Sequence, residues 1–463
     1  MKHFRTAILV GSIIAALPVT VMAAPPDRSV DGTVVTQASK LLDSVSTADG
    51  PGAAILVDRG GTIVFRQARG SANVELGVPL APTKVFRIAS VTKIFTAALV
   101  LKLAEEGKLS LDDTLARTLP DFPGAQTITI RQLLSHTAGM SDKSLLDDGA
   151  PGVLRQDMTL SALTALIAKE PLRFKPGSSQ AYANAGYILL AAVIEKATGK
   201  PWYGAMAERL FDPLKLSHTR YGAAGPIIPD RVAGYTRGSD RQVANADFIS
   251  VSVPASAGAL VSNVDDLRTW MRALATGHVI SPASFQAMSR PASVPEGTAM
   301  NPYGLGLYVW TIRGETVVGH TGQIDGFASF LAYIPSQDAT IVALGNDDTF
   351  DAQTVGRRLA AIMIGRPYVT ETVPLSGGLM QNLAGSYDDG GRTVTLTVKD
   401  GVLSYRREGG RSFPLQMMRD GTLHFTPDDL SYFTPLRDTG GRITGLEFRA
   451  RGEGQAKAIP RRF

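Results

Sequence analysis

Residues 87–95 have the sequence Arg-Ile-Ala-Ser-Val-Thr-Lys-Ile-Phe, with a serine and a lysine three positions apart. Apolar residues continue at helical spacing through Leu99, and Gly107 is an expected stop, so this stretch predicts a helix that opens at Ser90. On a helix, Ser90 and Lys93 stand one turn apart on the same side. The helix dipole there favours an alkoxide at Ser90 and disfavours protonated Lys93, and desolvation would lower the lysine pKa further. The pair therefore predicts a nucleophile with its activating base.

A Ser-x-x-Lys pair alone is a weak signal, because roughly one or two matches arise by chance in a chain of this length. The alternative is an N-terminal serine followed by a solvated lysine one helical turn later. The sequence contains one such match, and its context decides between the two interpretations.

The composition bounds the class of protein. The chain has 463 residues, 44% of them hydrophobic and 19% charged, which is typical of a globular protein with two or three domains. The formal net charge of +5 is small and dispersed, so nucleic acid is not an expected partner. The sequence has 0 cysteines, which excludes disulfides, and its 6 histidines are not in metal-ligand spacing. We therefore expect no metal site; that no cofactor is needed follows from the mechanism considered below.

The N-terminus resembles a secretory signal. Residues 1–5 are basic, residues 7–21 are largely apolar, and small residues at Val21 and Ala23 fit a cleavage site after Ala23. The alternative is an uncleaved anchor. No other apolar run reaches the length of a membrane span, so we expect a periplasmic or secreted protein without an integral membrane segment once residues 1–23 are removed.

The order of predicted elements indicates an α+β fold. Predicted strands lie near both ends of the first 370 residues, and predicted helices lie mainly between them. The expected strands are 53–57, 62–66, 303–311, 315–320, 327–334 and 340–344, and the expected helices are 35–45, 130–134, 159–168, 185–198, 202–210, 265–275 and 352–364. This order predicts one antiparallel sheet, assembled from both ends, beside a helical lobe. A cleft between sheet and lobe is a natural place for a site.

The character of the sequence changes from about Leu379. Residues 393–398 alternate strictly between polar and apolar, and Gly-containing turns recur at 400–401, 420–421 and 440–441. This pattern predicts a separate antiparallel β domain, a small barrel or sandwich.

Two further motifs change the interpretation of Ser90. Tyr182-Ala183-Asn184 stands just before an apolar helix, and 320–323, His-Thr-Gly-Gln, end a predicted strand. The three motifs in this order resemble the serine β-lactamase and penicillin-binding-protein superfamily, and its class C-like branch in particular. That branch also holds D-stereospecific peptidases and family VIII esterases. The resemblance runs from about residue 35 to 365, and the segments 133–139, 303–306 and 326–330 support it.

The resemblance implies a β-lactamase-like fold over residues 24–370, followed by an all-β domain over 371–463 that resembles lipocalin-like domains of some D-aminopeptidase-type relatives. Such a domain could shape the substrate cleft, or act as a passive spacer or an oligomer contact. The resemblance also implies catalysis through an acyl-enzyme. The partner is then a small-molecule or peptide substrate, and the oligomeric state stays open.

The resemblance assigns catalytic roles to three side chains. Ser90 would be acylated, and Lys93 would hold or receive its proton. Tyr182 can be a general base only if nearby cations such as Lys93 lower the pKa of its phenol, and otherwise it would pass a proton on without ionising. Asn184 would donate a hydrogen bond to the substrate amide or orient Lys93.

The resemblance places substrate binding on the strand that ends at 320–323. The backbone N–H groups of Ser90 and Gln323 would form the oxyanion hole, and Gly322 would allow close approach to the substrate. His320 and Thr321 complete this segment. Many relatives carry lysine at the position of His320, a fixed positive charge for a substrate carboxylate.

Histidine at position 320 is mostly neutral at pH 7, so this attraction weakens. The His-Thr-Gly variant resembles D-aminopeptidase-like members, which favours D-amino-acid amides, D-peptides or simple esters as substrates. The alternatives are a β-lactamase or DD-carboxypeptidase, and a cell-wall ligand binder without turnover. A further alternative is that His320 only preserves the strand edge.

Several other residues are expected to be structural. His136 is expected to satisfy backbone groups, Trp270 and Trp310 to pack in the core, and Asp265 to supply charge at a helix start together with Asp266. Ser262 and Asp265 have the spacing of a capping pair. The sequence has no Gly-x-Ser-x-Gly elbow, which argues against an α/β-hydrolase, and a class A β-lactamase pattern is not apparent.

Overall fold

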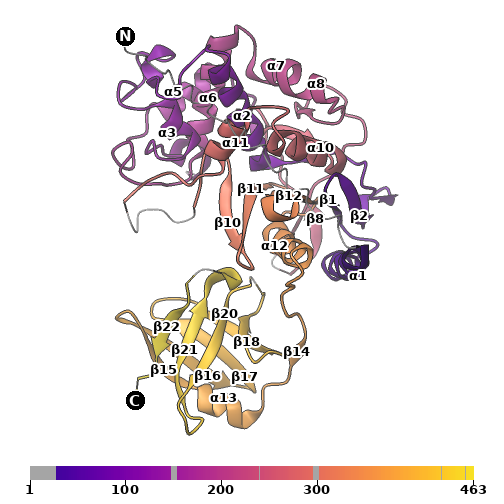
Figure 1. Ribbon diagram of the computed structural model, residues 1–463, viewed down its shortest axis with the longest axis vertical. Helices are drawn as coiled ribbons and strands as arrows, with labels where there is room; N and C mark the ends of the chain where they lie inside the picture. Colours follow the sequence, from indigo (N-terminus) through magenta and orange to yellow (C-terminus); the bar gives the residue numbers. More distant parts are fainter. Residues whose placement is uncertain are drawn as a thin grey trace, which may run out of the picture.

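A computed structural model describes residues 28–147, 154–238, 240–295, 302–428, 430–453 and 455–462. The predicted secretory signal over residues 1–23 lies outside the described residues. Two modules follow one another along the chain, a larger one of helices and sheet and a smaller all-β one (Figure 1). None of the helices in the described part of the chain has the length and apolar character that a membrane span requires.

A six-stranded antiparallel sheet forms the centre of the larger module. Its strand order is β10-β11-β12-β13-β1-β2. The strands are β1 (Ala53–Arg59), β2 (Thr62–Arg69), β10 (Tyr308–Ile312), β11 (Glu315–Ile324), β12 (Phe327–Ile334) and β13 (Ala339–Gly345). Residue Ala53 pairs with Gly345, so the first strand lies beside the last one and the predicted assembly from both ends is confirmed. The strand expected from residue 303 begins later, at Tyr308.

Helices cover both faces of this sheet. On one face α1 (Arg28–Val45) and α12 (Ala352–Met363) pack over Ile55 and its neighbours (Figure 1). On the other face α10 (Val264–Ala275) and the helical lobe cover Leu56. Strand β1 is therefore buried on both sides, which explains its continuous apolar run. The capping pair expected at 262 and 265 is wrong, because the extended residue Asn263 caps α10 by accepting the Asp266 N–H at 2.9 Å.

The helical lobe is built around one helix, α2 (Thr92–Glu105), that is buried over most of its length. The other elements of the lobe are α3 (Ile130–Leu134), α5 (Leu160–Ile167), α6 (Asn184–Thr198), α7 (Trp202–Met206), η4 (Ala207–Phe211), α8 (Asp212–Leu214), α9 (Ala255–Gly258) and α11 (Pro282–Met288). The short strands nearby are β3 (Ser71–Asn73), β4 (Val78–Pro79), β5 (Phe86–Arg87), β6 (Arg220–Tyr221), β7 (Tyr235–Arg237), β8 (Val243–Asn245) and β9 (Leu260–Ser262).

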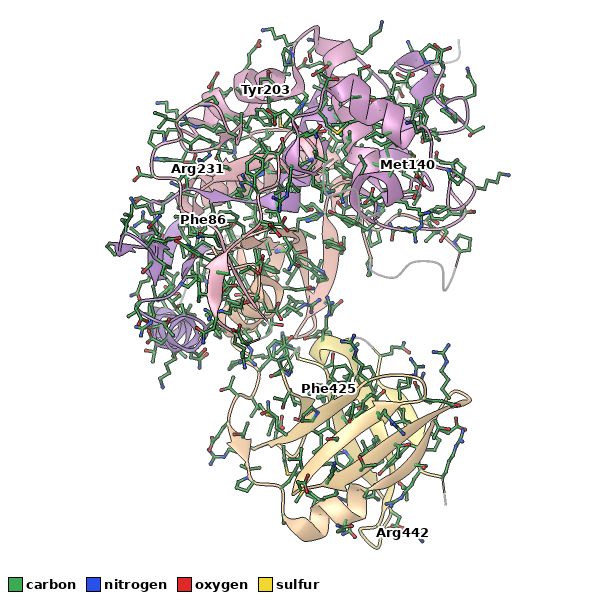
Figure 2. The ribbon with its side chains drawn as sticks, turned by 180° about the vertical axis from the view of Figure 1, so that it is seen from behind. Phe86, Met140, Tyr203, Arg231, Phe425 and Arg442 are labelled. Atoms are coloured by element: carbon green, nitrogen blue, oxygen red, sulfur yellow. The ribbon has the colours of Figure 1, made fainter. Side chains whose placement is uncertain are left out.

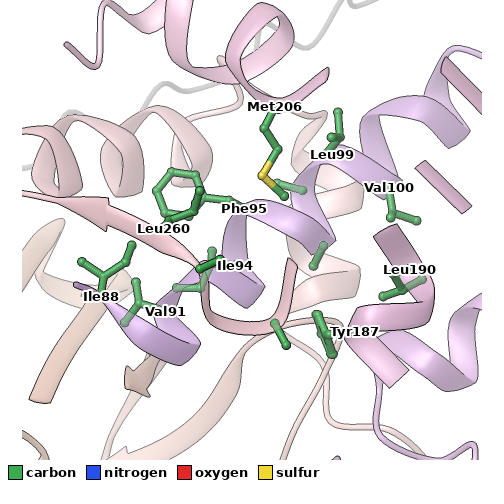
Figure 3. Close-up of a cluster of buried hydrophobic side chains, with 14 of the residues drawn as sticks. Ile88, Val91, Ile94, Phe95, Leu99, Val100, Tyr187, Leu190, Met206 and Leu260 are labelled. Atoms are coloured by element: carbon green, nitrogen blue, oxygen red, sulfur yellow. The ribbon is translucent and has the colours of Figure 1, made fainter. Parts of the chain in front are cut away.

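Apolar side chains of α2 lie in a cluster with apolar residues from neighbouring elements, among them Tyr187, Met206 and Leu260 (Figure 3). Phe95 stacks on Trp270 with ring centroids 4.1 Å apart, and Leu99 and Val100 extend the same core. Both predicted core tryptophans are buried, Trp270 at 0% and Trp310 at 5% exposure, so that expectation is confirmed. Burial of this order fixes the backbone of α2 and the side chains that its first turn carries.

The smaller module is a sheet that curls back on itself. It contains α13 (Gly377–Leu383) and the strands β14 (Thr372–Val373), β15 (Gly385–Asp389), β16 (Arg392–Lys399), β17 (Val402–Arg407), β18 (Ser412–Met418), β19 (Leu423–Phe425), β20 (Tyr432–Arg437), β21 (Ile443–Arg449) and β22 (Lys457–Pro460). The strands β15 to β22 pair in sequence order, and the bridge between Tyr387 and Arg461 brings the last strand back to the first. Alternate side chains fill the interior, so the module is a near-barrel with its own core.

The two modules meet at α12 and at the turn between β10 and β11. Phe425 lies near this junction and Arg442 at the opposite end of the small module (Figure 2). Leu430 of the small module is buried in the same cluster as α12. The Arg358 guanidinium donates to Asp428 at 2.7 Å, and Glu453 accepts from the Tyr368 hydroxyl at 2.8 Å. Apolar and charged contacts thus hold the modules together.

Candidate active site

A sharp turn between a strand and a helix presents Ser90. Strand β5 pairs with β9, and the chain then passes through the 3₁₀ turn η1 (Ala89–Val91) into α2. The predicted helix start at Ser90 is therefore two residues early, because Ala89 takes a left-handed conformation with φ +45°. That conformation costs an L residue about 1–2 kcal/mol, which the buried surroundings of Ala89 and α2 offset.

Lys93 lies beneath Ser90 and is fully buried, with 0% of its surface exposed. Its Nζ lies 3.0 Å from Ser90 Oγ and donates to Asn184 Oδ1 and to the Ala257 carbonyl, both at 2.8 Å. The last two oxygens can only accept hydrogen bonds. A neutral lysine amine has two protons and one lone pair, so these two acceptors take both protons and leave the lone pair for the Ser90 hydroxyl.

Burial lowers the pKa of Lys93 to about 7, and the negative charge of Asp142 opposes this shift. Lys93 is thus a base at neutral pH, as the desolvation argument from the sequence predicts. The same burial lowers the pKa of His136 well below its usual value, and the charge of Lys93 adds to the effect.

Asp142 holds the other side of the lysine site together, and the sequence patterns did not single it out. Its carboxylate accepts the backbone N–H of Asn184 and of Ala185, both at 2.8 Å, at the start of α6. It also accepts from Asn184 Nδ2 at 3.1 Å, which directs Oδ1 of that amide toward Lys93. Asn184 was expected either to bind the substrate amide or to orient Lys93, and its hydrogen bond with Lys93 shows the second role.

Tyr182 faces Ser90 and stays protonated. Burial raises the pKa of Tyr182 well above 10, the nearby Tyr308 adds to the rise, and a hydrogen bond with the Ser90 hydroxyl only partly opposes it. The Lys93 Nζ lies over the Tyr182 ring at 4.7 Å from its centroid. Of the two alternatives that the sequence left open for Tyr182, the raised pKa favours the one in which the phenol passes a proton on without ionising.

His320 lies on β11, is buried among the rings of Tyr182, Tyr303 and Tyr308, and is neutral. Burial lowers its pKa to about 3, and the charge of Lys93 contributes. Nδ1 faces the Thr321 carbonyl, which can only accept, so Nδ1 carries the proton and Nε2 accepts from the Tyr303 hydroxyl at 3.1 Å. Both ring nitrogens are occupied, which leaves His320 neither charge nor a free donor for a substrate carboxylate.

Gly322 lets β11 run directly against the turn that carries Ser90. A Cβ on Gly322 would lie 2.4 Å from the Ile88 carbonyl oxygen and 3.0 Å from the Ser90 nitrogen. Gly322 was expected to let this strand approach the substrate; in the structure it lets the strand approach the backbone at Ile88 and Ser90. The next residue, Gln323, lines the same cavity as Ser90. Thr321 lines a separate cavity, together with Gln323.

Two cavities flank the Ser90–Tyr182 pair. One, of about 300 Å³, is lined by Ser90, Asn184, Gln323 and Asp325 and by apolar side chains: Leu145, Leu154, Ile188, Ile249 and Val253. The second, of about 250 Å³, is lined by Tyr182, other aromatic residues and Arg173. Among the described residues, no group of three or more His, Asp or Glu side chains is arranged to hold a metal ion.

The second cavity is walled by an aromatic cluster. His136, expected to be structural, packs on Tyr182 at 4.3 Å and on Tyr303 at 4.5 Å between ring centroids. Its Nδ1 accepts the Ala183 N–H at 3.3 Å, so it satisfies a backbone group, although in the Tyr182 segment and not in its own loop. Tyr308 and Arg173 were not named as site residues from the sequence, because neither lies within the three ordered motifs.

The comparisons with known proteins agree with this geometry. Residues 38–363 match the model of the Beta-lactamase family. Protein flp from Staphylococcus aureus (strain MW2) is 29% identical over 308 residues, which cover 64% of this chain and 59% of that protein. Penicillin-binding protein 4* of Bacillus subtilis (strain 168) is 28% identical over 68% of this chain and 72% of its own length. The match thus spans less than two thirds of the length of flp.

Solved structures show the same fold. A D-stereospecific amidohydrolase from Streptomyces sp. is 27% identical with a TM-score of 0.61, and it covers 73% of this chain and 99% of its own. SurE is 26% identical with a TM-score of 0.60, and it covers 94% of this chain and 99% of its own. D-amino acid amidase from Ochrobactrum anthropi SV3, at 22% identity and a TM-score of 0.63 over 73% of this chain and 99% of its own, shows the fold alone. Because the family match extends over well more than half of the residues, the chain belongs to the Beta-lactamase family.

Proposed function

We propose that the protein is a serine hydrolase that cleaves an amide or ester bond through an acyl-enzyme on Ser90. The observation that carries this proposal is the buried amine of Lys93, whose two fixed acceptors leave one position, 3.0 Å from Ser90 Oγ. An amine with a pKa of about 7 at that position is a competent base at neutral pH.

Acylation begins with transfer of the Ser90 proton to neutral Lys93. Ser90 Oγ forms a bond to the substrate carbonyl carbon, and the carbonyl oxygen takes the negative charge. The backbone N–H groups of Ser90 and Gln323 would stabilise this oxyanion, a contribution that is typically about 3–4 kcal/mol for one donor.

Collapse of the tetrahedral intermediate breaks the bond to the leaving group. Tyr182, protonated and hydrogen-bonded to Ser90, is the group placed to give the leaving atom a proton, and the ammonium of Lys93 restores it. Water then attacks the acyl-enzyme carbonyl while Lys93 takes one of its protons. The bond to Ser90 Oγ breaks, Lys93 returns that proton to Oγ, and the carboxylic acid leaves with Ser90 and neutral Lys93 restored. In this scheme Tyr182 relays a proton and Lys93 is the base.

We propose D-amino-acid amides, D-peptides or simple esters as the substrate class. The neutral, doubly hydrogen-bonded His320 gives no positive charge for the carboxylate that penicillin-like substrates carry. The similarity to a D-stereospecific amidohydrolase supports the same class.

Turnover of β-lactams or DD-carboxypeptidase activity is the second candidate, favoured by the similarity to penicillin-binding protein 4*. A binder of cell-wall ligands without turnover is the third, and the presence of both Lys93 and Tyr182 argues against it, since a binder needs no proton relay.

Covalent labelling and a substrate panel test these proposals. Incubation with a chromogenic ester is expected to add the acyl mass to Ser90, and Ser90→Ala is expected to lose both the label and turnover. D-alanine p-nitroanilide is expected to be turned over faster than nitrocefin. Wild-type turnover by Ser90→Ala would refute the assignment, dominant nitrocefin hydrolysis would favour the second candidate, and stable labelling by a fluorescent penicillin without release would favour the third.

We also propose the division into residues 24–370 and 371–463, and export after removal of residues 1–23. The basic and apolar order of the first 23 residues supports export. Separate cores in the two modules support the division.

A further inference from the structure

The cavity that contains Ser90 also contains a carboxylate for which the acylation scheme has no use. Asp325 lies in the turn between β11 and β12 and lines this cavity. In the described part of the chain it forms no ion pair, and its charged neighbours act on it only at longer range. An unpaired carboxylate at the rim of a largely apolar substrate cavity is a candidate for direct contact with a substrate cation.

The geometry of acylation places one part of the substrate in this cavity. The attacked carbonyl must bond to Ser90 Oγ with its oxygen toward the Ser90 and Gln323 amides. The leaving group must lie toward Tyr182, because that residue supplies its proton, and Tyr182 lines the other cavity. The acyl residue therefore enters the cavity that Asp325 lines, two residues beyond Gln323.

The charges around Asp325 favour a cation. Burial and the carboxylates of Asp348 and Asp247 raise the pKa of Asp325, and two arginines oppose them. Both arginines are engaged elsewhere, Arg87 with a backbone carbonyl at 3.2 Å and Arg155 with Asp247 at 2.6 Å. A bound ammonium group would relieve the repulsion among the carboxylates.

We infer that Asp325 binds the α-ammonium group of the residue whose carbonyl Ser90 attacks. The preferred substrates are then amides or peptides with a free amine next to the scissile bond, and N-acylated compounds, penicillins included, lack the group that Asp325 recognises. This inference rests on the proposed function, since it takes Ser90 as the nucleophile.

A matched pair of substrates tests the inference. Wild type is expected to prefer D-alanine p-nitroanilide over N-acetyl-D-alanine p-nitroanilide. Asp325→Asn is expected to lower kcat/KM for the free amine by about 10- to 100-fold, mainly through KM, because a charged hydrogen bond is lost. Turnover of the N-acetyl compound and of p-nitrophenyl acetate is expected to stay within about two-fold, and Asp325→Glu is expected to keep most of the preference.

Asp247→Asn is the control for the general field of the site. Asp247 lies within electrostatic reach of Asp325 but does not line the cavity. An equal loss in Asp247→Asn, no preference in wild type, or a parallel loss for both anilides in Asp325→Asn would overturn the inference.

Labelling of Ser90 by a fluorophosphonate distinguishes an error in the role of Asp325 from an error in the proposed function. If the label is on Ser90 and the preference is absent, only the role of Asp325 is wrong. If Ser90→Ala takes the label as wild type does, the proposed function itself is wrong.

Discussion

At the scale of single residues, burial separates the roles of two groups that sequence reasoning left exchangeable. The ordinary pKa values of Lys93 and Tyr182 are close to each other, at 10.5 and 10.0 respectively. Desolvation disfavours the charged form of each, and so moves the two pKa values in opposite directions. Lys93 becomes neutral and basic near pH 7, whereas Tyr182 keeps its proton. Titratable groups whose pKa values are driven apart in this way mark the base and the proton donor of a site.

The pH dependence of hydrolysis follows from the pKa of Lys93. For an uncharged ester, kcat/KM is expected to rise with pH through about 7, as Lys93 in the free enzyme loses its proton. Burial lowers the pKa of His320 to about 3, so His320 does not titrate in the range where kcat/KM is expected to rise. Initial rates with p-nitrophenyl butyrate between pH 5 and 9 measure this rise in kcat/KM. A flat profile across pH 6–8 would contradict the assignment of Lys93 as base.

The same pKa shift has a consequence for stability. Between about pH 7 and 10.5 the unfolded chain holds a proton on Lys93 that the folded protein lacks. Below about pH 7, burial of the protonated Lys93 lowers the free energy of unfolding by its full amount. This loss becomes smaller as the pH rises from about 7 to 10.5, so stability increases over that range. Burying Lys93 is thus a cost that the fold carries for the sake of the site.

At the scale of elements, the Asp142 carboxylate caps helix α6 and, through Asn184, also positions Lys93. Asp142→Ala removes the acceptor of two backbone N–H groups and of the Asn184 side-chain amide. We expect the free energy of unfolding to fall by about 1–2 kcal/mol, as for the loss of an N-cap. We also expect kcat to fall, because Asn184 no longer holds its oxygen toward Lys93. Urea denaturation and steady-state kinetics on the same preparation measure the two effects.

A second helix cap provides the control. Ser376 caps α13 in the small module by accepting the Leu379 N–H at 3.3 Å. Ser376→Ala is expected to lower stability modestly and leave kcat unchanged. If Asp142→Ala also lost stability without losing kcat, the capping role would stand and the link to Lys93 would not.

At the scale of the whole molecule, the pattern of apolar residues predicted much of the architecture. Hydrophobic periodicity predicted a sheet built from both ends, a helical lobe and an alternating β module, because each face has to be buried. It missed the turn at Ala89, since a left-handed alanine is imposed by packing and has no local signal. The β10 start was also misplaced, because residues 303–307 carry apolar side chains without pairing as a strand.

The sequence predicted those residues of the candidate site that belong to the ordered motifs. Ser90, Lys93, Tyr182 and Asn184 converge as the ordered motifs suggest. Asp142, which positions Asn184, and Asp325, which lines the Ser90 cavity, stand outside these motifs and gave no signal. A lone carboxylate in a sequence looks the same on a solvated surface and at a cavity rim.

The junction between the modules yields a prediction at the largest scale. Asp428 accepts from Arg358 at 2.7 Å, and Leu430, two residues later, is buried with α12. Burial alone would raise the pKa of Asp428, but hydrogen bonds from His424 and the Leu430 N–H, with the charge of Arg358, lower it below 3.8. The stabilisation is therefore present above about pH 4 and lost as the pH falls through the lowered value.

Asp428→Asn removes this charge at neutral pH and leaves a mostly buried Arg358 without its counter-ion. We expect the free energy of unfolding of the larger module to fall by about 1–3 kcal/mol, the cost of an unpaired buried group. All 3 tryptophans of the chain precede residue 370, so their fluorescence during urea denaturation reports the larger module alone. The exposed turn variant Asp400→Asn, in the same small module, is expected to match wild type. The wild-type midpoint is also expected to approach that of Asp428→Asn below pH 4. Identical midpoints for the two variants at pH 7 would mean that the junction adds no stability to the module that contains Ser90.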